Sequence, residues 1–257
     1  MQRPSTTIEH STFLLLRFGL IAVLLCVASC ASEFGTYRGV PNSKKVQPMP
    51  EGASPPEQLS FEEASARWTV QFTIPNPLAQ DPDLAPRSMP RAPETGQIRI
   101  WATLYDAEVI ETWIRTRCHE DSLSAQVCDS LRAAYREIHR PDEEFRIQLW
   151  LESDFSVKSL EPDLWAIYLL DDEEIMYEPR RVRTGEVEER QRELYAPFHR
   201  RTITKTQIRR EIDLYFPKVT FFGKTLVGRK ARFLKLVFSR DRRTMGEGVW
   251  IFESEGG

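Results

Sequence analysis

The chain has 257 residues, of which 28% are charged and 41% hydrophobic, and its formal net charge is −3. This length can bury a full core as one domain with appendages, and the composition excludes a polytopic membrane protein and a chain that is disordered throughout. The weak negative charge argues against nucleic-acid binding by the whole protein, although the distribution of charge matters more than its sum.

An apolar run near the N-terminus has the features of a secretory signal. Residues 18–29 are uninterrupted by charge, and about a dozen residues are too few to span a bilayer as a helix, which needs roughly 20. Basic residues precede the run at Arg3 and Arg17, and it leads into the sequence VASC at residues 27–30. The alternative, a buried core helix with incidental cysteines, is disfavoured by these flanks.

The sequence VASC, an aliphatic residue and two small residues before a cysteine, resembles the lipobox of bacterial lipoprotein precursors. In that class the signal peptide is cleaved before the cysteine, whose thiol takes a diacylglycerol, and the new amino terminus is usually acylated as well. The resemblance implies a signal peptide over residues 1–29 and a lipidated Cys30. Because Ala31 rather than Asp follows, it implies attachment to the outer membrane of a Gram-negative host, facing the periplasm. Cys26 competes as the lipidation site, but the preceding Leu25 is too bulky for the motif.

Residues 30–66 predict a disordered tether, because five prolines lie among Ser, Gly, Lys and Glu with little periodicity. A flexible chain of about 35 residues has a root-mean-square reach of roughly 30 Å, so the domain can work at a distance from the bilayer. A second proline-rich stretch, residues 75–93, predicts a long loop inside the domain.

Residues 67–257 predict a mainly β domain. Four stretches alternate apolar with polar residues, as strands with one buried face do: 68–74, 98–104, 145–151 and 234–238. Residues 164–170 are apolar on both faces and predict a central strand, while 203–216 alternate less cleanly and 248–252 close the chain. Roughly seven to nine short strands without crossover helices favour an antiparallel β-sandwich, immunoglobulin-like or similar, over a parallel α/β sheet.

A helical hairpin is predicted as an insertion at about residues 106–140. Asp106 can cap its first helix, and its second helix has apolar residues at helical spacing between 127 and 138. Cys118 and Cys128 lie on either side of the turn between the helices. In an exported protein this pair predicts a disulfide rather than a metal site, because only His119 nearby supplies another soft ligand.

The mature chain shows no catalytic or metal-binding motif. Its three histidines are not in HExxH or another tight metal spacing, and the GKT sequence at 223–225 lacks the first glycine of a P-loop. The acidic run 171–174 lacks the ligand pattern of a calcium loop and predicts a solvated hairpin tip. The sequence therefore predicts no metal, no cofactor and no enzyme, although a carboxylate pair that meets only in space stays open.

Charge is unevenly distributed along the domain. Residues 142–178 have twelve Asp or Glu and two Lys or Arg, whereas residues 180–243 have 19 Lys or Arg and seven acids. One interpretation is that neighbouring strands form weak cross-strand ion pairs. The other is a surface for an anionic partner such as lipid head groups, lipopolysaccharide phosphates or an acidic envelope protein. Nucleic acid is not expected as a partner outside the cytoplasm. The candidate residues of such a surface are Arg200, Arg201, Arg209 and Arg210.

Two tryptophans face away from the predicted core. Trp101 and Trp150 lie out of phase with the apolar residues of their strands, so they point to the opposite face of the sheet. One expectation is that the helical hairpin, with Trp113, packs over them. The alternative is an aromatic platform for a glycan or a partner protein.

These features predict a lipid-anchored, non-catalytic lipoprotein that acts as a binding or structural adaptor at the outer membrane. A second hypothesis is a carrier or accessory module for a small apolar or glycan ligand held between sheet and helices, and a third is a hydrolase with a dispersed site. An adaptor should have a filled core and an exposed patch. A carrier needs an apolar cavity of several hundred cubic ångströms, and an enzyme needs convergent polar groups in a cleft.

Overall fold

The computed structural model describes residues 40–41, 43–48, 54–56, 59–78, 96–196, 201–220, 223–227 and 231–252. All of them belong to the unit Arg38–Gly257. The signal peptide, the lipidation site Cys30 and most of the predicted loop 75–93 lie outside the described residues.

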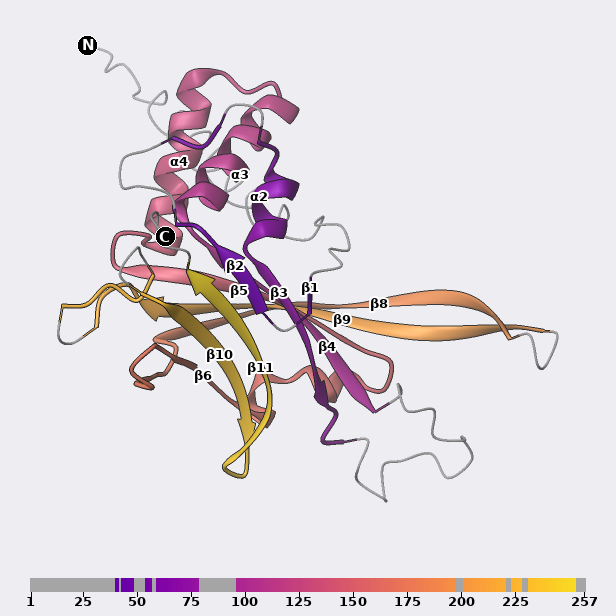
Figure 1. Ribbon diagram of the computed structural model, residues 1–257. Coiled ribbons are helices and arrows are strands. Elements are labelled where there is room, and N and C mark those ends of the chain that lie inside the picture. The colour runs from indigo at the N-terminus through magenta and orange to yellow at the C-terminus, as the bar shows by residue number, and fades with distance from the viewer. Residues whose placement is uncertain are drawn as a thin grey trace, which may run out of the picture. The chain divides into compact units, whose positions relative to one another are not determined.

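Two sheets form the layers of the domain (Figure 1). The first contains, in spatial order, β1 (Val40–Pro41), β3 (Thr69–Pro75), β4 (Gln97–Tyr105), β5 (Glu144–Ser153), β9 (Arg201–Pro217) and β8 (Arg181–Ala196). The second contains β2 (Ser43–Val46), β11 (Arg243–Phe252), β10 (Phe233–Arg240), β6 (Ala166–Leu170) and β7 (Met176–Tyr177). Neighbouring strands are antiparallel except for the pairs β1–β3 and β2–β11. The predicted antiparallel β-sandwich is confirmed.

The shared core follows from the alternation along the strands. Ile100, Leu149 and Ile212 are fully buried on one face of the first sheet. Strand β11 approaches β3 closely because it has glycine at two positions. A Cβ atom on Gly248 would lie 2.6 Å from Cγ2 of Val70, so a larger residue there would force the two sheets apart.

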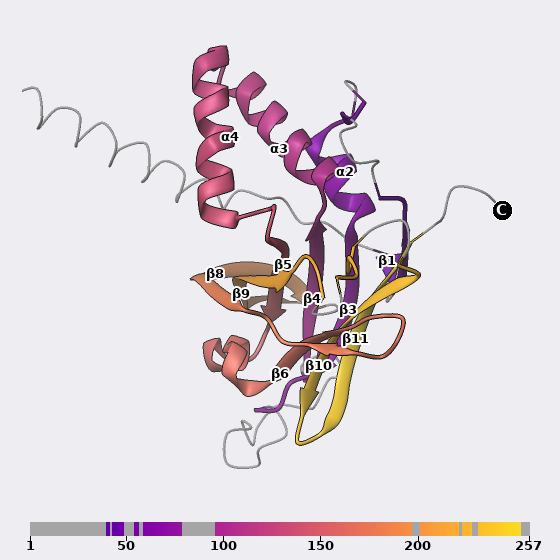
Figure 2. The same cartoon turned by 90° about the vertical axis from the view of Figure 1, so that its left-hand side faces the viewer.

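The helical hairpin is confirmed as an insertion between β4 and β5. Helix α3 (Ala107–Glu120) follows Asp106, whose side chain makes no capping hydrogen bond. Helix α4 (Ala125–His139) is capped by the Ser124 hydroxyl, which accepts a hydrogen bond from the Val127 amide at 3.4 Å. The hairpin stands at the end of the first sheet where β4 ends and β5 begins (Figure 2).

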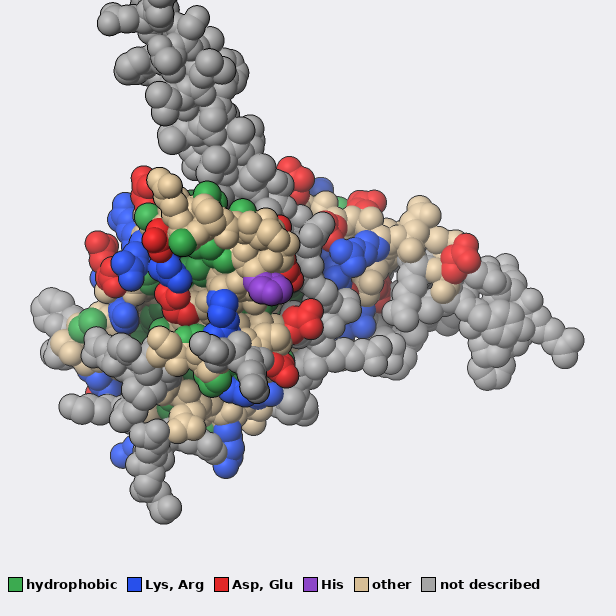
Figure 3. All heavy atoms as spheres, turned by 90° about the horizontal axis from the view of Figure 1, so that it is seen from above, with side chains coloured by type: hydrophobic (Ala, Val, Ile, Leu, Met, Phe, Trp, Pro, Cys, Tyr) green, Lys and Arg blue, Asp and Glu red, His purple; other side chains and the backbone are tan. Residues whose placement is uncertain are grey.

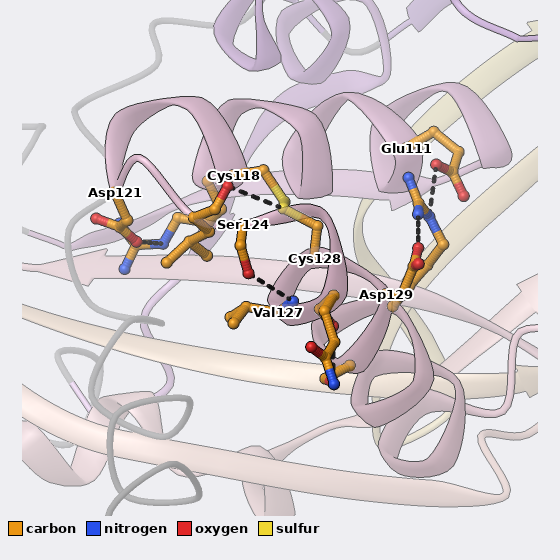
Figure 4. The surroundings of a disulfide bond; sticks show 12 residues. Glu111, Cys118, Asp121, Ser124, Val127, Cys128 and Asp129 are labelled. Carbon is orange, nitrogen blue, oxygen red and sulfur yellow. Dashed lines mark hydrogen bonds and ion pairs between the residues drawn. A yellow bond between two sulfur atoms is a disulfide. The ribbon is translucent and has the colours of Figure 1, made fainter.

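The predicted disulfide is also confirmed. Cys118 near the end of α3 bonds to Cys128 in the first turn of α4, and their Cα atoms are 5.8 Å apart (Figure 4). It joins the two helices beside their connecting turn. No helix in the described part of the chain is long and apolar enough to cross a membrane.

The prediction of a disordered tether through residue 66 is wrong in two places. Residues 43–46 form β2, which pairs in parallel with β11, and Val46 is 3% exposed. Helix α2 (Phe61–Arg67) begins at Ser60, which forms a capping box with Glu63. The sequence did not reveal these elements because β2 has four residues and α2 has seven, too few for a clear hydrophobic period.

Strands β8 and β9 are unusually long, with 16 and 17 residues. They pair from Arg181 opposite Tyr215 to Ala196 opposite Arg201, but β9 pairs with β5 only from Ile208 onwards. Beyond Ile208 the described part of the chain places no third strand beside them, and they extend away from the two sheets as a two-stranded ribbon (Figure 1). Residues 190–196 and 201–207 are named here the projecting ribbon.

Candidate functional site

A buried polar network lies where the hairpin meets the first sheet, on the face opposite the sandwich core. Its centre is Arg146 of β5, whose side chain is 10% exposed. The Arg146 Nε donates a hydrogen bond to Asp213 Oδ1 at 2.6 Å, and a guanidinium nitrogen lies 3.5 Å from Glu211 Oε1. The guanidinium also lies 4.4 Å from the centre of the Tyr105 ring. One arginine therefore compensates two carboxylates that alternation places on neighbouring β9 positions.

A chain of side-chain hydrogen bonds connects Tyr105 to Glu211. The Tyr105 hydroxyl donates to Gln148 Oε1 at 2.9 Å, and the Gln148 amide donates to the Glu211 carboxylate. Burial raises the pKa of Glu211 to about 7, and the neighbouring Asp213 carboxylate adds to the rise while Arg146 opposes it. Glu211 can therefore exchange a proton near neutral pH.

His139 of α4 extends the network towards the hairpin. Its Nδ1 lies 2.8 Å from the Tyr215 hydroxyl, and its ring lies between the rings of Tyr135 and Tyr215, with centroid distances of 4.4 and 5.8 Å. Burial lowers the pKa of His139 to about 3, and nearby arginines including Arg146 lower it further. The imidazole is therefore neutral at physiological pH and serves as an uncharged hydrogen-bond partner.

A cavity of about 200 Å³ opens between the hairpin and this network. Its lining includes four apolar residues: Leu104, Ile110, Ile114 and Phe145. It also includes polar residues: Arg132, Tyr135, Arg136, His139 and Arg146. The cavity lies where the carrier hypothesis placed it, between sheet and helices, but it is smaller than that hypothesis required.

The projecting ribbon is the second candidate region. Its residues, 190–196 and 201–207, include four Lys or Arg and one Glu, in a chain whose net charge is −3. The register places Arg192 opposite Lys205, and like charges directly opposite one another destabilise a strand pair. The side chains of Gln191, Glu193 and Thr204 are exposed.

The four predicted arginines have different positions. Arg209 is 7% exposed and donates from Nε to Glu152 at 2.8 Å, and Arg210 pairs with Glu161 at 2.7 Å. The assignment of these two residues to a partner surface is wrong, because carboxylates of the domain already neutralise them. Arg201 begins β9 in the projecting ribbon, and Arg200 lies outside the described residues.

Ion pairs between the acidic and basic segments are confirmed at several places. Arg181 Nε donates to Glu144 at 2.9 Å, and its guanidinium lies 4.1 Å from the Tyr215 ring centre. Lys224 Nζ lies 2.6 Å from Asp172 and 2.9 Å from Glu173. Seen from above, described acidic and basic side chains are interspersed (Figure 3).

The acidic turn, residues 171–174, is not a fully solvated hairpin tip, because one of its carboxylates is buried and hydrogen-bonded. Asp171 is 2% exposed, and its carboxylate accepts hydrogen bonds from the backbone of the turn and from the Tyr177 hydroxyl. Lys224 of the GKT sequence binds carboxylates of this turn, so its contacts are not those of a phosphate-binding lysine.

The two tryptophans lie opposite each other in the β4–β5 ladder. Trp101 is 9% exposed and Trp150 is half-buried, so the pair does not offer an open platform of two rings. Trp113, which was expected to cover them, packs against Tyr135 of α4, with ring centroids 5.7 Å apart.

Sequence reasoning missed the Arg146 network. The available signal was the polar phase of two strands, in which Arg146 and Asp213 alternate with core residues, together with Tyr135 and His139 four residues apart on α4. Within the described ranges, no three His, Cys, Asp or Glu side chains are grouped to hold a metal ion. Comparisons with family models, curated proteins and solved structures gave no match.

Proposed function

We propose that the protein is a lipid-anchored, non-catalytic adaptor of the cell envelope that binds an anionic partner through the projecting ribbon. The ribbon itself is the observation that supports this most strongly. It extends beyond the last β5–β9 pair, Ser153 with Ile208, and carries an excess of basic residues. Isolated two-stranded ribbons are marginally stable in water, so a partner that covers this one would also stabilise it.

The anchor is proposed from the VASC sequence, with Cys30 as the lipidated residue. Because β2 joins the fold at Ser43, only 12 residues lie between Cys30 and the second sheet. A fully extended chain of that length spans at most about 45 Å. The domain would therefore work close to the bilayer, where lipid head groups, lipopolysaccharide phosphates and acidic envelope proteins are all within reach.

Substitution of Cys30 by Ser tests the anchor. The variant is expected to be released from membranes by carbonate washing, whereas the unaltered protein stays bound. A variant that remains fully in the membrane pellet would contradict lipid attachment at this residue.

Photocrosslinking in cells tests the binding surface. A photoreactive residue at Thr204 reports on the ribbon, and the same residue at Thr73, an exposed position of β3, is the matched control. We expect discrete adducts from Thr204 and not from Thr73. An acidic protein gives adducts of defined mass, whereas a lipid partner is revealed by flotation with anionic vesicles and not with neutral ones. Equal adducts from both sites would contradict the proposal.

A further inference from the structure

We propose that the cavity between α3, α4 and the Tyr105–Arg146 pair binds a neutral, ring-sized molecule that has an apolar body and one hydrogen-bond-accepting oxygen. This ligand site is independent of the projecting ribbon, which lies at the other end of β8 and β9.

The apolar wall sets the size and the body of the ligand. Ile110 and Ile114 lie one turn apart on α3, Phe145 lies at the start of β5, and all three line the cavity. Apolar cavities of about 150 Å³ hold benzene, and ligands of drug size need roughly 300 Å³ or more. A volume of about 200 Å³ therefore fits a single ring with a small substituent.

The hydroxyl of Tyr135 supplies the polar contact. Tyr135 lines the cavity and is 5% exposed, and among the described residues no acceptor is found for its hydroxyl hydrogen, since the neighbouring Arg146 guanidinium can only donate. Burial raises its pKa to about 12, so the group stays protonated and can donate. A buried donor without an acceptor is costly, and a ligand oxygen would satisfy it.

The charges around the cavity favour a neutral ligand. Four cationic side chains line it, and so do four carboxylates: Arg132, Arg136, Arg146 and Lys218, with Asp106, Glu111, Asp142 and Glu144. Arg146 is already compensated by Asp213, and Arg132 lies 3.4 Å from Glu111. Arg136 and Lys218 are exposed to solvent, so an added carboxylate inside the cavity would meet no buried cation that lacks a carboxylate partner, and it gains little there.

Nuclear magnetic resonance titration of the purified full-length protein tests the site. Acetophenone provides a ring and an acceptor oxygen, toluene provides the ring alone, and benzoate provides the ring with a negative charge. We expect saturable shifts with acetophenone, weaker binding of toluene and benzoate, and contacts from the acetophenone ring to the methyl groups of Ile110 and Ile114. These contacts are measured in the unaltered protein and need no variant.

Two variants test separately how the apolar lining and the Tyr135 hydroxyl contribute to binding. Tyr135→Phe should weaken acetophenone binding about fivefold, as the loss of one hydrogen bond does, and leave toluene binding unchanged. Ile110→Phe should fill the cavity and weaken both ligands at least about tenfold. Absence of saturable binding to the unaltered protein, or equal acetophenone affinity in folded Tyr135→Phe, would overturn the proposal.

Discussion

Arginines at the base of strands β8 and β9 and arginines along the projecting ribbon are placed in opposite surroundings. At the base, Arg209 is 7% exposed and bonded to Glu152, and Arg181 packs on Tyr215 while pairing with Glu144. In the ribbon, the Arg190 side chain is 54% exposed and pairs with Glu188, two residues away on the same strand. The difference is one of burial: Arg209 is buried together with its carboxylate partner, whereas Arg190 stays exposed to solvent while it pairs with Glu188.

The physical cause is the point at which the third strand ends. Strand β5 covers β9 only as far as Ser153 opposite Ile208. Where β5 covers β9, the β5 residues Glu152 and Glu144 pair with Arg209 and Arg181, and both carboxylates are buried. Pairs of this kind are costly to break, whereas exposed pairs contribute little to stability.

The largest expected effect is that of Arg146→Met. The substitution would leave Asp213 and Glu211 buried without their cation, and we expect a loss of about 3 to 5 kcal/mol in the free energy of unfolding, measured with urea. Arg190→Met, in the ribbon, is the matched control and should change stability by less than about 0.5 kcal/mol. Similar losses in both variants would remove the contrast between the two regions.

The disulfide should give the next largest effect. The double variant Cys118→Ser, Cys128→Ser is expected to lose about 2 to 3 kcal/mol of unfolding free energy, because the bond restricts the unfolded chain. Reduction of the unaltered protein should lower its stability by a similar amount and leave the variant unchanged. If reductant destabilised both proteins equally, the bond would not be the cause.

Protonation of Glu211 gives a smaller, pH-dependent effect. Its pKa is about 7 in the folded protein, above its ordinary value of 4.5, so between these pH values the folded state holds a proton that the unfolded state has lost. This group therefore contributes stability at low pH that disappears as the pH rises towards 7. His139 acts in the opposite direction, because its pKa of about 3 lies below its ordinary 6.5 and stability is lost as the pH falls.

The variant Glu211→Gln separates the contribution of the Glu211 carboxyl to the pH dependence of stability from that of His139. We expect the stability of this variant relative to the unaltered protein to rise by about 2 kcal/mol between pH 5 and pH 8, as measured by urea unfolding at both values. A difference that does not depend on pH would show that Glu211 ionises normally in the folded protein.

Shortening the ribbon should have the smallest effect on stability. Replacing residues 190–207 by Asn-Gly closes β8 and β9 with a two-residue turn after Glu189 and before Ile208. Because the ribbon has no third strand, the midpoint of thermal unfolding should change by only a few degrees. A variant that fails to fold would show that the ribbon belongs to the core structure.

Much of the fold was predictable because periodicity is a local signal. Alternation located β3, β4, β5 and β10, and a period near 3.6 residues located both helices of the hairpin. Periodicity assigns a side chain to a face of its strand but does not show what covers that face. For this reason the Arg146 network was not predicted, and Arg209 could not be distinguished from Arg201.

The most direct test of the adaptor proposal is the yield of photocrosslinked adducts from Thr204 after charge reversal in the ribbon. Arg192→Glu with Lys205→Glu keeps two like charges opposite each other, so the cross-strand repulsion is matched while the sign changes. Lys158→Glu with Arg180→Glu, both at exposed positions of the domain, changes the net charge equally. We expect the ribbon pair to abolish the adducts and the control pair to preserve them. Adducts that survive ribbon reversal, or that both pairs reduce alike, would contradict binding of an anionic partner by the ribbon.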